Sequence, residues 1–323
     1  MLLGNYYGMN DRMTTILEGI VGRLPEGIKL EYRSGCMWTQ ESVTPLNYAE
    51  SEAAVSDLVI VCAGTTPLME GEEGESLMTT ESGDRAKIEL PAVQKKFIRK
   101  LSELGVRIVL VLTGGSPIAL GEVAEMVEAI LFVWYPGQEG GRAVASLLFG
   151  DVVPSGKLTL TFPKSTADLP PFDDYSMAGR TYRYAEKEPL FPFGFGLSYT
   201  TFAYRNLKAA SPKASGFNLS VTVENTGVVA ADEVVQFYLS ALETRLPAPL
   251  SQLVGFRRIH LKPGQSKTVK LAICPEMLMQ FDEDGRQVFE PGKFRLTAGG
   301  CSPSERGLAL GASQPASVEF HIK

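Results

Sequence analysis

Runs of apolar, β-branched residues recur in the first half of the chain, with helical patterns between them. The runs have strand length and little polar alternation, which is typical of strands buried on both faces of a parallel sheet. The segments between them repeat apolar residues at helical spacing. This alternation predicts an α/β domain with a mostly parallel sheet over residues 1–165. The predicted strands are 58–64, 107–113 and 129–135, with 28–32 a weaker pattern, and the predicted helices are 14–24, 92–104 and 141–149.

The pattern changes twice further along the chain. Between residues 166 and 215, proline, glycine and aromatic residues interrupt every period, which predicts an irregular linker. From residue 216 to 323, short alternating segments are separated by turn signals, which predicts an antiparallel β-sandwich. Its expected strands are 218–223, 233–239, 253–261, 267–273 and 293–298.

Length and charge exclude several classes of protein. A chain of 323 residues is long enough for two domains. The net charge of −6 comes without a basic stripe, so we expect no nucleic-acid partner. The apolar runs are too short to span a bilayer, and no secretory signal opens the chain. These features predict a soluble protein without a membrane partner and leave its compartment open.

Few side chains suited to metal or nucleophilic chemistry are available. The four cysteines follow no metal-ligand spacing and the chain has only two histidines, so we expect no metal and no cofactor. Cys62 lies within a predicted strand, where a buried thiol acting as a small hydrophobe is the simpler interpretation. Dinucleotide binding would need a glycine-rich fingerprint that the sequence does not contain. The chemistry is therefore expected to depend on carboxylates.

An acidic segment over residues 69–85 follows the first long predicted strand. Ligands in open α/β folds bind beyond the carboxyl ends of the strands, so this position favours a functional site. Crowded carboxylates also favour a general acid. A solvated acidic loop is the alternative, and the spacing does not fit an EF-hand calcium site. The acidic residues are Glu70, Glu72, Glu73, Glu75 and Glu81.

Two further segments end predicted strands. The turn at 114–117 lacks a phosphate-binding fingerprint and is interpreted as a tight connection between strand and helix. Trp134 and Tyr135 stand where an aromatic ring could stack on a sugar, although burial of the tryptophan in the core is equally common.

Five motifs follow one another in the middle of the chain: WYPGQEGG (134–141), LFGDVVPSGKL (148–158), TFP (161–163), GRTYRY (179–184) and PFGFGLSYTTF (192–202). The β-sandwich region adds four more: VENTG (223–227), LVGF (253–256), LKPG (261–264) and EPG (290–292). The first five resemble the C-terminal half of the family 3 glycoside hydrolases, which are β-glucosidases and β-xylosidases. The other four resemble the fibronectin type III-like module of that family.

The resemblance implies a retaining mechanism, in which a carboxylate nucleophile and a second carboxyl act in turn on a β-linked glucoside or xyloside oligosaccharide. In this family the acid/base glutamate comes from a loop of the α/β sandwich. The E-x-E pattern of the family favours Glu72 here, followed by Glu70 and Glu73, with Glu81 a lesser option. The residues expected to bind substrate are Arg85, Trp134 and Tyr135.

The family also carries an N-terminal (β/α)8 barrel that provides the nucleophilic aspartate, and no segment of this chain resembles it. The chain is therefore expected to be a truncated product, a fragment or half of a split enzyme, inactive alone. Its expected partner is such a barrel or a second copy of the chain. The alternative is a non-catalytic carbohydrate-binding or scaffold module.

Overall fold

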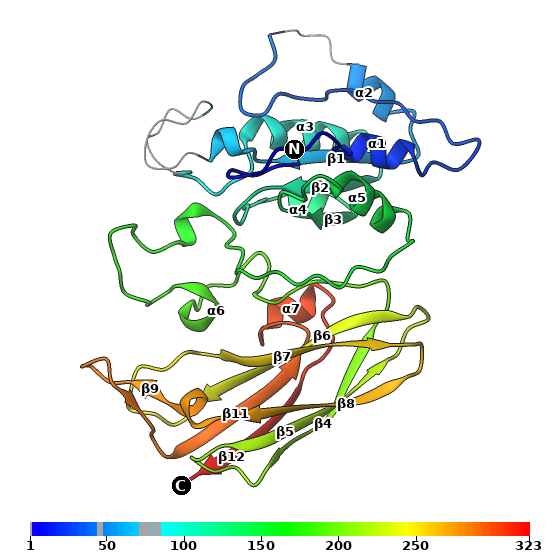
Figure 1. Cartoon of the computed structure of the whole chain (residues 1–323). Coiled ribbons are helices and arrows are strands. Elements are labelled where there is room, and N and C mark those ends of the chain that lie inside the picture. The colour runs from blue at the N-terminus through cyan, green and yellow to red at the C-terminus, as the bar shows by residue number, and fades with distance from the viewer. Residues whose placement is uncertain (1, 44–47, 71–77, 79–84) are drawn as a thin grey trace. The chain divides into compact units, whose positions relative to one another are not determined.

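The computed structural model describes residues 2–43, 48–70, 78 and 85–323. The chain folds as two compact units, which are described separately (Figure 1). The α/β unit comprises Met1–Val152 and Pro163–Asp168, and the β-sandwich unit comprises Val153–Phe162 and Leu169–Lys323.

The α/β unit is built on a three-stranded parallel sheet in the order β1-β2-β3. The strands are β1 (Val59–Gly64), β2 (Ile108–Thr113) and β3 (Ala129–Phe132). The central strand β2 is almost entirely buried, as expected for an apolar run with neighbours on both sides. Because all three strands run in the same direction, their carboxyl ends meet at one edge of the sheet (Figure 1).

Helices α1 (Ile16–Val21) and α5 (Gly140–Leu148) pack together and share a core cluster with Val111 of β2. Glu18 and the N-cap residue of α1 form a capping box that fixes where α1 begins. The helices approach closely at Gly141, where a Cβ atom would lie 1.9 Å from a backbone oxygen. The other helical segments of the unit are α2 (Tyr48–Ala53), η1 (Pro67–Met69), α3 (Ala92–Glu103), α4 (Val123–Met126) and η2 (Thr166–Asp168).

The β-sandwich unit has two antiparallel sheets, in the orders β12-β11-β6-β7 and β4-β5-β8, and a small β9-β10 hairpin. Alternating residues of both sheets point inward and form one apolar core, as Val221, Phe237 and Leu296 illustrate. The strands are β4 (Phe202–Ala210), β5 (Phe217–Asn225), β6 (Ala231–Ala241), β7 (Gln252–Leu261), β8 (Ser266–Ile273), β9 (Gln280–Phe281), β10 (Gln287–Val288), β11 (Gly292–Gly299) and β12 (Ala316–Ile322), and the helical segments are α6 (Thr181–Tyr184), η3 (Pro275–Leu278) and α7 (Glu305–Ala309).

The predicted fold class is confirmed: a parallel α/β sheet is followed by an antiparallel β-sandwich. One predicted element is wrong, because residues 28–32 form no strand. Ile28 and Tyr32 are largely exposed, and none of the strands in the described ranges pairs with this segment. The predicted strand 129–135 ends early, at Phe132, because the backbone turns to a positive φ of 55° at Trp134.

Two further expectations need correction. Cys62 is exposed rather than buried, although its neighbours Val61 and Ala63 on β1 are buried. The segment expected to be an irregular linker contains β4 within its last third. That strand escapes the pattern because a bulge at Asn206, with a φ of 54°, breaks the alternation. The domain boundaries at residues 165 and 215 remain predictions.

Candidate functional site

Each strand of the parallel sheet ends in a polar or aromatic segment at the shared carboxyl edge. Thr65 follows β1, Gly115 follows β2, and Tyr135 follows β3 by three residues. The end of β1 is held by the buried side chain of Gln94 on α3, which accepts from the Gly64 N–H and donates to the Gly64 carbonyl. The fold thus brings together side chains that are far apart in the sequence.

Glu70 collects one hydrogen bond from the end of each strand. The Thr65 hydroxyl donates to Oε1 at 2.8 Å, and the Gly115 N–H donates to the same oxygen at 3.1 Å. The Tyr135 hydroxyl donates to Oε2 at 2.7 Å. The η1 turn, capped by the Thr66 side chain, directs Glu70 to this position. Both carboxylate oxygens are therefore held against the sheet edge.

Tyr135 is kept as a hydrogen-bond donor by its surroundings. Burial, together with the adjacent Glu70 carboxylate, raises the pKa of the Tyr135 phenol above its ordinary value. The phenol therefore stays protonated at physiological pH. Its oxygen also lies 3.3 Å from the Thr65 hydroxyl, which closes a small polar network around Glu70.

Arg85 adds a positive charge to this network. Its Nη1 donates to the Ser116 hydroxyl at 3.1 Å, whereas its buried Nη2 has no partner among the described residues. Burial lowers the pKa of Arg85, and the negative charge of Glu70 opposes that effect. A buried guanidinium nitrogen with donors to spare is suited to hold an oxygen atom of a ligand.

Trp134 has an unusual backbone conformation beside this network. Its φ of 55° lies in the left-handed region, which a bulky side chain seldom adopts. Its ring meets Phe132 edge to face, with the ring centroids 4.6 Å apart. Its carbonyl accepts from the Gly114 N–H at 3.3 Å, which ties the end of β3 to the end of β2. Local strain held in place by packing is a frequent feature of binding sites.

The structure brings together Glu70, Arg85 and Tyr135 from the residues predicted by sequence, with Trp134 next to them. Glu72 and Glu73, like Glu75 and Glu81, lie outside the described residues. The sequence analysis missed three members of the network: Thr65, which directly follows a predicted strand, and Gly115 and Ser116, which lie in the turn at 114–117.

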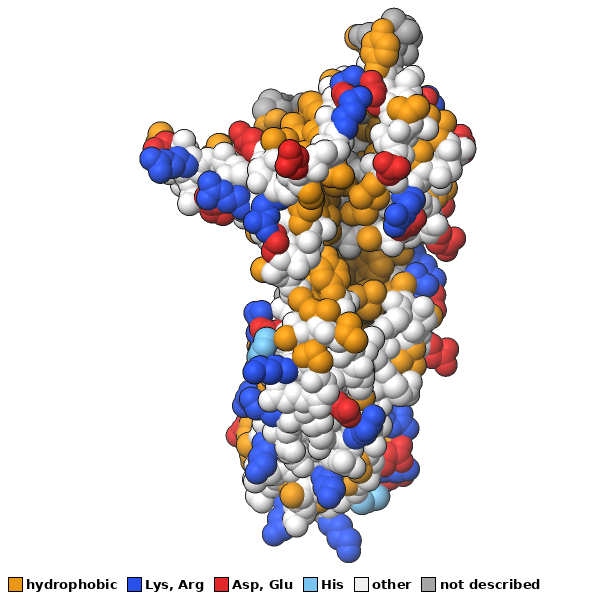
Figure 2. Space-filling model, turned by 90° about the vertical axis from the view of Figure 1, so that its right-hand side faces the viewer, with side chains coloured by type: hydrophobic (Ala, Val, Ile, Leu, Met, Phe, Trp, Pro, Cys, Tyr) orange, Lys and Arg blue, Asp and Glu red, His pale blue; other side chains and the backbone are white. Residues whose placement is uncertain are grey.

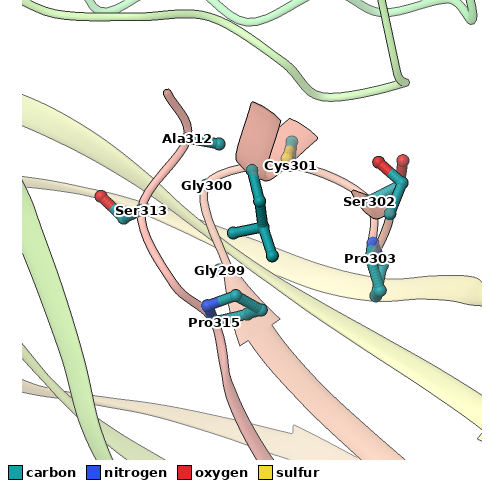
Figure 3. Close-up of a pocket in the computed structure, with 10 residues that line it drawn as sticks. Gly299, Gly300, Cys301, Ser302, Pro303, Ala312, Ser313 and Pro315 are labelled. Atoms are coloured by element: carbon teal, nitrogen blue, oxygen red, sulfur yellow. The ribbon is translucent and has the colours of Figure 1, made fainter. Parts of the chain in front are cut away.

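Other features of the described residues lie outside this network. A hollow in the β-sandwich unit, around Cys301 and Pro315, has a volume of about 10 Å³, which is room for one water at most (Figure 3).

No group of three His, Cys, Asp or Glu side chains is placed to hold a metal ion within the described ranges. Hydrophobic side chains gather in patches on the visible face of the molecule (Figure 2). None of the described helices is long and apolar enough to cross a membrane.

Two known domain families match successive parts of the chain. Residues 1–199 match the glycosyl hydrolase family 3 C-terminal domain, and residues 233–302 match a fibronectin type III-like domain. The chain therefore belongs to family 3 of the glycosyl hydrolases, of which it holds the C-terminal part.

Individual relatives agree with this membership. A β-xylosidase of Formosa agariphila is 38% identical over 94% of this chain, and a periplasmic β-glucosidase of Salmonella typhimurium is 35% identical over 90%. The chain spans 42% of the length of each. A solved β-glucosidase of Erythrobacter marinus is 30% identical and covers 99% of this chain with a TM-score of 0.82, and the chain covers 45% of it.

A second solved structure shows a ligand. It is a family 3 exo-β-xylosidase in complex with a xylobiose aziridine activity-based probe, 27% identical, and it covers the whole of this chain with a TM-score of 0.84. The present chain covers 43% of that protein.

Proposed function

We propose that this chain supplies the general acid/base and part of the sugar cleft of a retaining β-glycosidase that acts on β-linked glucosides or xylosides. The observation that supports it is the Glu70 network. That network fixes the start of the acidic segment at the carboxyl edge of the parallel sheet, where ligands of α/β folds bind. The relatives are β-xylosidases and β-glucosidases, and this supports the choice of substrate class.

Within this proposal Glu70 acts as a positioning residue. A general acid must present an O–H to the departing sugar oxygen, and later accept a proton from water. Both oxygens of Glu70 already accept hydrogen bonds, from three donors in total. We therefore keep Glu72 as the preferred acid/base, with Glu73 next. This choice rests on the sequence pattern.

Arg85, Tyr135 and Trp134 would line the cleft. The unpartnered Nη2 of Arg85 would donate to a sugar hydroxyl, and the aromatic residues would limit the access of water. The nucleophile would come from the (β/α)8 barrel of the family, placed about 5–5.5 Å from the acid/base carboxyl. The chain alone is therefore expected to hydrolyse no glycoside.

The test combines this chain with a separately expressed barrel half of a family 3 relative and measures hydrolysis of aryl β-glucosides and β-xylosides. The acid/base variant should lose about 100-fold or more in turnover. Azide should restore turnover of an activated aryl substrate for that variant alone, because the small anion replaces water in attacking the glycosyl–enzyme. Glu72→Ala is expected to behave in this way.

Glu73→Ala tests the second candidate, and Glu75→Ala is the matched control, since it removes one carboxylate from the same acidic segment. If the barrel docks and restores hydrolysis, yet neither Glu72→Ala nor Glu73→Ala lowers it, the proposed acid/base assignment is wrong. If azide rescues Glu70→Ala, the positioning role given to Glu70 is wrong.

A further inference from the structure

The loop formed by residues 169–180, named here the aromatic loop, belongs to the β-sandwich unit and leads into α6 (Figure 1). It exposes two aromatic rings almost completely: Phe172 is 97% exposed and Tyr175 is 92% exposed. Single exposed hydrophobic residues are common on protein surfaces. Two such rings three residues apart on one loop need a further explanation, because they leave apolar ring faces in water.

The aromatic loop is braced from within by Arg180. The Arg180 Nε donates to the Ser176 carbonyl at 3.0 Å, and Nη2 donates to the Pro171 carbonyl at 3.0 Å. Nη2 also donates to the Asp174 carbonyl. One guanidinium therefore joins three carbonyls spread around the loop.

Two hydrogen bonds near Asp174 complete the bracing. The Asp174 N–H donates to the Pro171 carbonyl at 3.2 Å, and the Ser176 N–H donates to the Asp174 carboxylate at 2.8 Å. A loop held in this way keeps its rings displayed, so little ordering remains to be done when a ligand binds.

The charges around the rings indicate which ligand fits. The positive charge of Arg180 is directed at backbone carbonyls inside the loop, whereas Asp173 and Asp174 stand beside the rings and are exposed. Hydrogen bonds from Ser176 lower the pKa of Asp174, so its carboxylate remains an acceptor at neutral pH. Negative charge at this position disfavours anionic polymers and acidic lipids. A neutral sugar offers apolar C–H faces for the rings and hydroxyl donors for the carboxylates.

We propose that the aromatic loop binds a β-linked oligosaccharide, whose pyranose rings stack on Phe172 and Tyr175. The choice of sugar rests on the proposed function, since the relatives are β-glycosidases. The binding itself requires no hydrolysis and no second domain.

The experiment measures binding of xylohexaose, cellohexaose and laminarihexaose to the full chain by titration calorimetry. Phe172→Ala and Tyr175→Ala should each weaken binding about five- to tenfold, because each removes one stacking surface. Tyr175→Phe keeps the ring and should bind like the original chain. Phe256→Ala is the matched control, because Phe256 is a 56% exposed aromatic residue on β7 of the same unit.

A fourth variant tests the bracing. Arg180→Lys keeps the charge but loses the planar fork that joins three carbonyls, so it should weaken binding while both rings remain. The proposal is wrong if the chain binds none of the three hexasaccharides, or if Phe172→Ala and Tyr175→Ala bind as well as Phe256→Ala. It is also wrong if these variants abolish self-association in light scattering and leave sugar binding unchanged, since the loop would then be a protein interface.

The failure of this proposal and that of the proposed function can be distinguished. If the full chain binds none of the three hexasaccharides, yet hydrolysis is intact in the barrel-complemented assay, the loop proposal alone is wrong. Intact binding with no hydrolysis in that assay concerns the acid/base assignment alone. Thermal unfolding of each variant checks that the fold is unchanged, which is expected because both rings are exposed.

Discussion

Replacing Tyr135 by phenylalanine should destabilise the α/β unit by about 1–2 kcal/mol. The change removes one hydroxyl, which donates to Glu70 Oε2 at 2.7 Å and lies 3.3 Å from the Thr65 hydroxyl. A hydrogen bond to a charged group contributes about 1.5–3 kcal/mol when it is well buried. The pair is only partly buried, so water can replace part of the lost interaction. We therefore expect a value near the lower end of that range.

Tryptophan fluorescence gives an assay that reports on the relevant unit. The chain has two tryptophans, Trp38 and Trp134, and both lie in the α/β unit. Urea unfolding followed by fluorescence therefore measures that unit without a contribution from the β-sandwich. Glu70→Gln and the double variant complete a double-mutant cycle, in which a coupling of about 1 kcal/mol is expected.

Tyr7→Phe is the matched control, because it makes the same chemical change at a side chain that is 64% exposed, and it should be neutral. The reasoning would be refuted by a coupling energy near zero between Tyr135 and Glu70. A stabilising effect of Tyr135→Phe would refute it as well, because the hydroxyl would then be poorly satisfied in the folded protein.

Three further changes follow from the structure. Gly64→Ala should destabilise the α/β unit by about 3 kcal/mol or more in urea unfolding, because its Cβ would lie 1.9 Å from a backbone oxygen at a φ of +125°. Although burial opposes it, hydrogen bonding from Thr166 lowers the pKa of Glu89. The ionised Glu89 carboxylate therefore stabilises the folded protein above the ordinary carboxyl pKa, and this stabilisation is lost as pH falls through the lowered pKa. Glu89→Gln removes the titrating group, so the free energy of unfolding should depend less on pH between about pH 5 and 3. Lys157→Met should destabilise the β-sandwich unit by about 3–5 kcal/mol in calorimetry, because it leaves the buried Glu233, 3.3 Å away, without its cation.

The sequence predicted most of the core elements because their patterns are local. The central strand β2 is a continuous apolar run, and β5 alternates buried and more exposed residues along its whole length. The prediction of a strand at residues 28–32 is wrong because an apolar pattern does not show whether another strand lies beside the segment to pair with it. The strand β4 was missed because its bulge breaks the period of two.

The sequence predicted where the candidate site lies, but it did not predict all of the residues that form the site. The rule that ligands bind at the carboxyl ends of strands located Glu70 and Tyr135 near each other. The donors to Glu70, however, are separated from it by 5, 45 and 65 residues along the chain. Contacts of that kind depend on the register of three strands, which a single sequence does not reveal.

The same register explains how Glu70 is held. Its donors come from the end of each strand, so its position is fixed by the sheet rather than by the conformation of the acidic segment. A carboxylate held this firmly is suited to orient a neighbour and poorly suited to exchange protons with a substrate, because each transfer would break one of these hydrogen bonds. If this division of roles is correct, Tyr135→Phe and Glu70→Gln should impair hydrolysis in the barrel-complemented enzyme without azide rescue, whereas the variant of the true acid/base should regain turnover with azide.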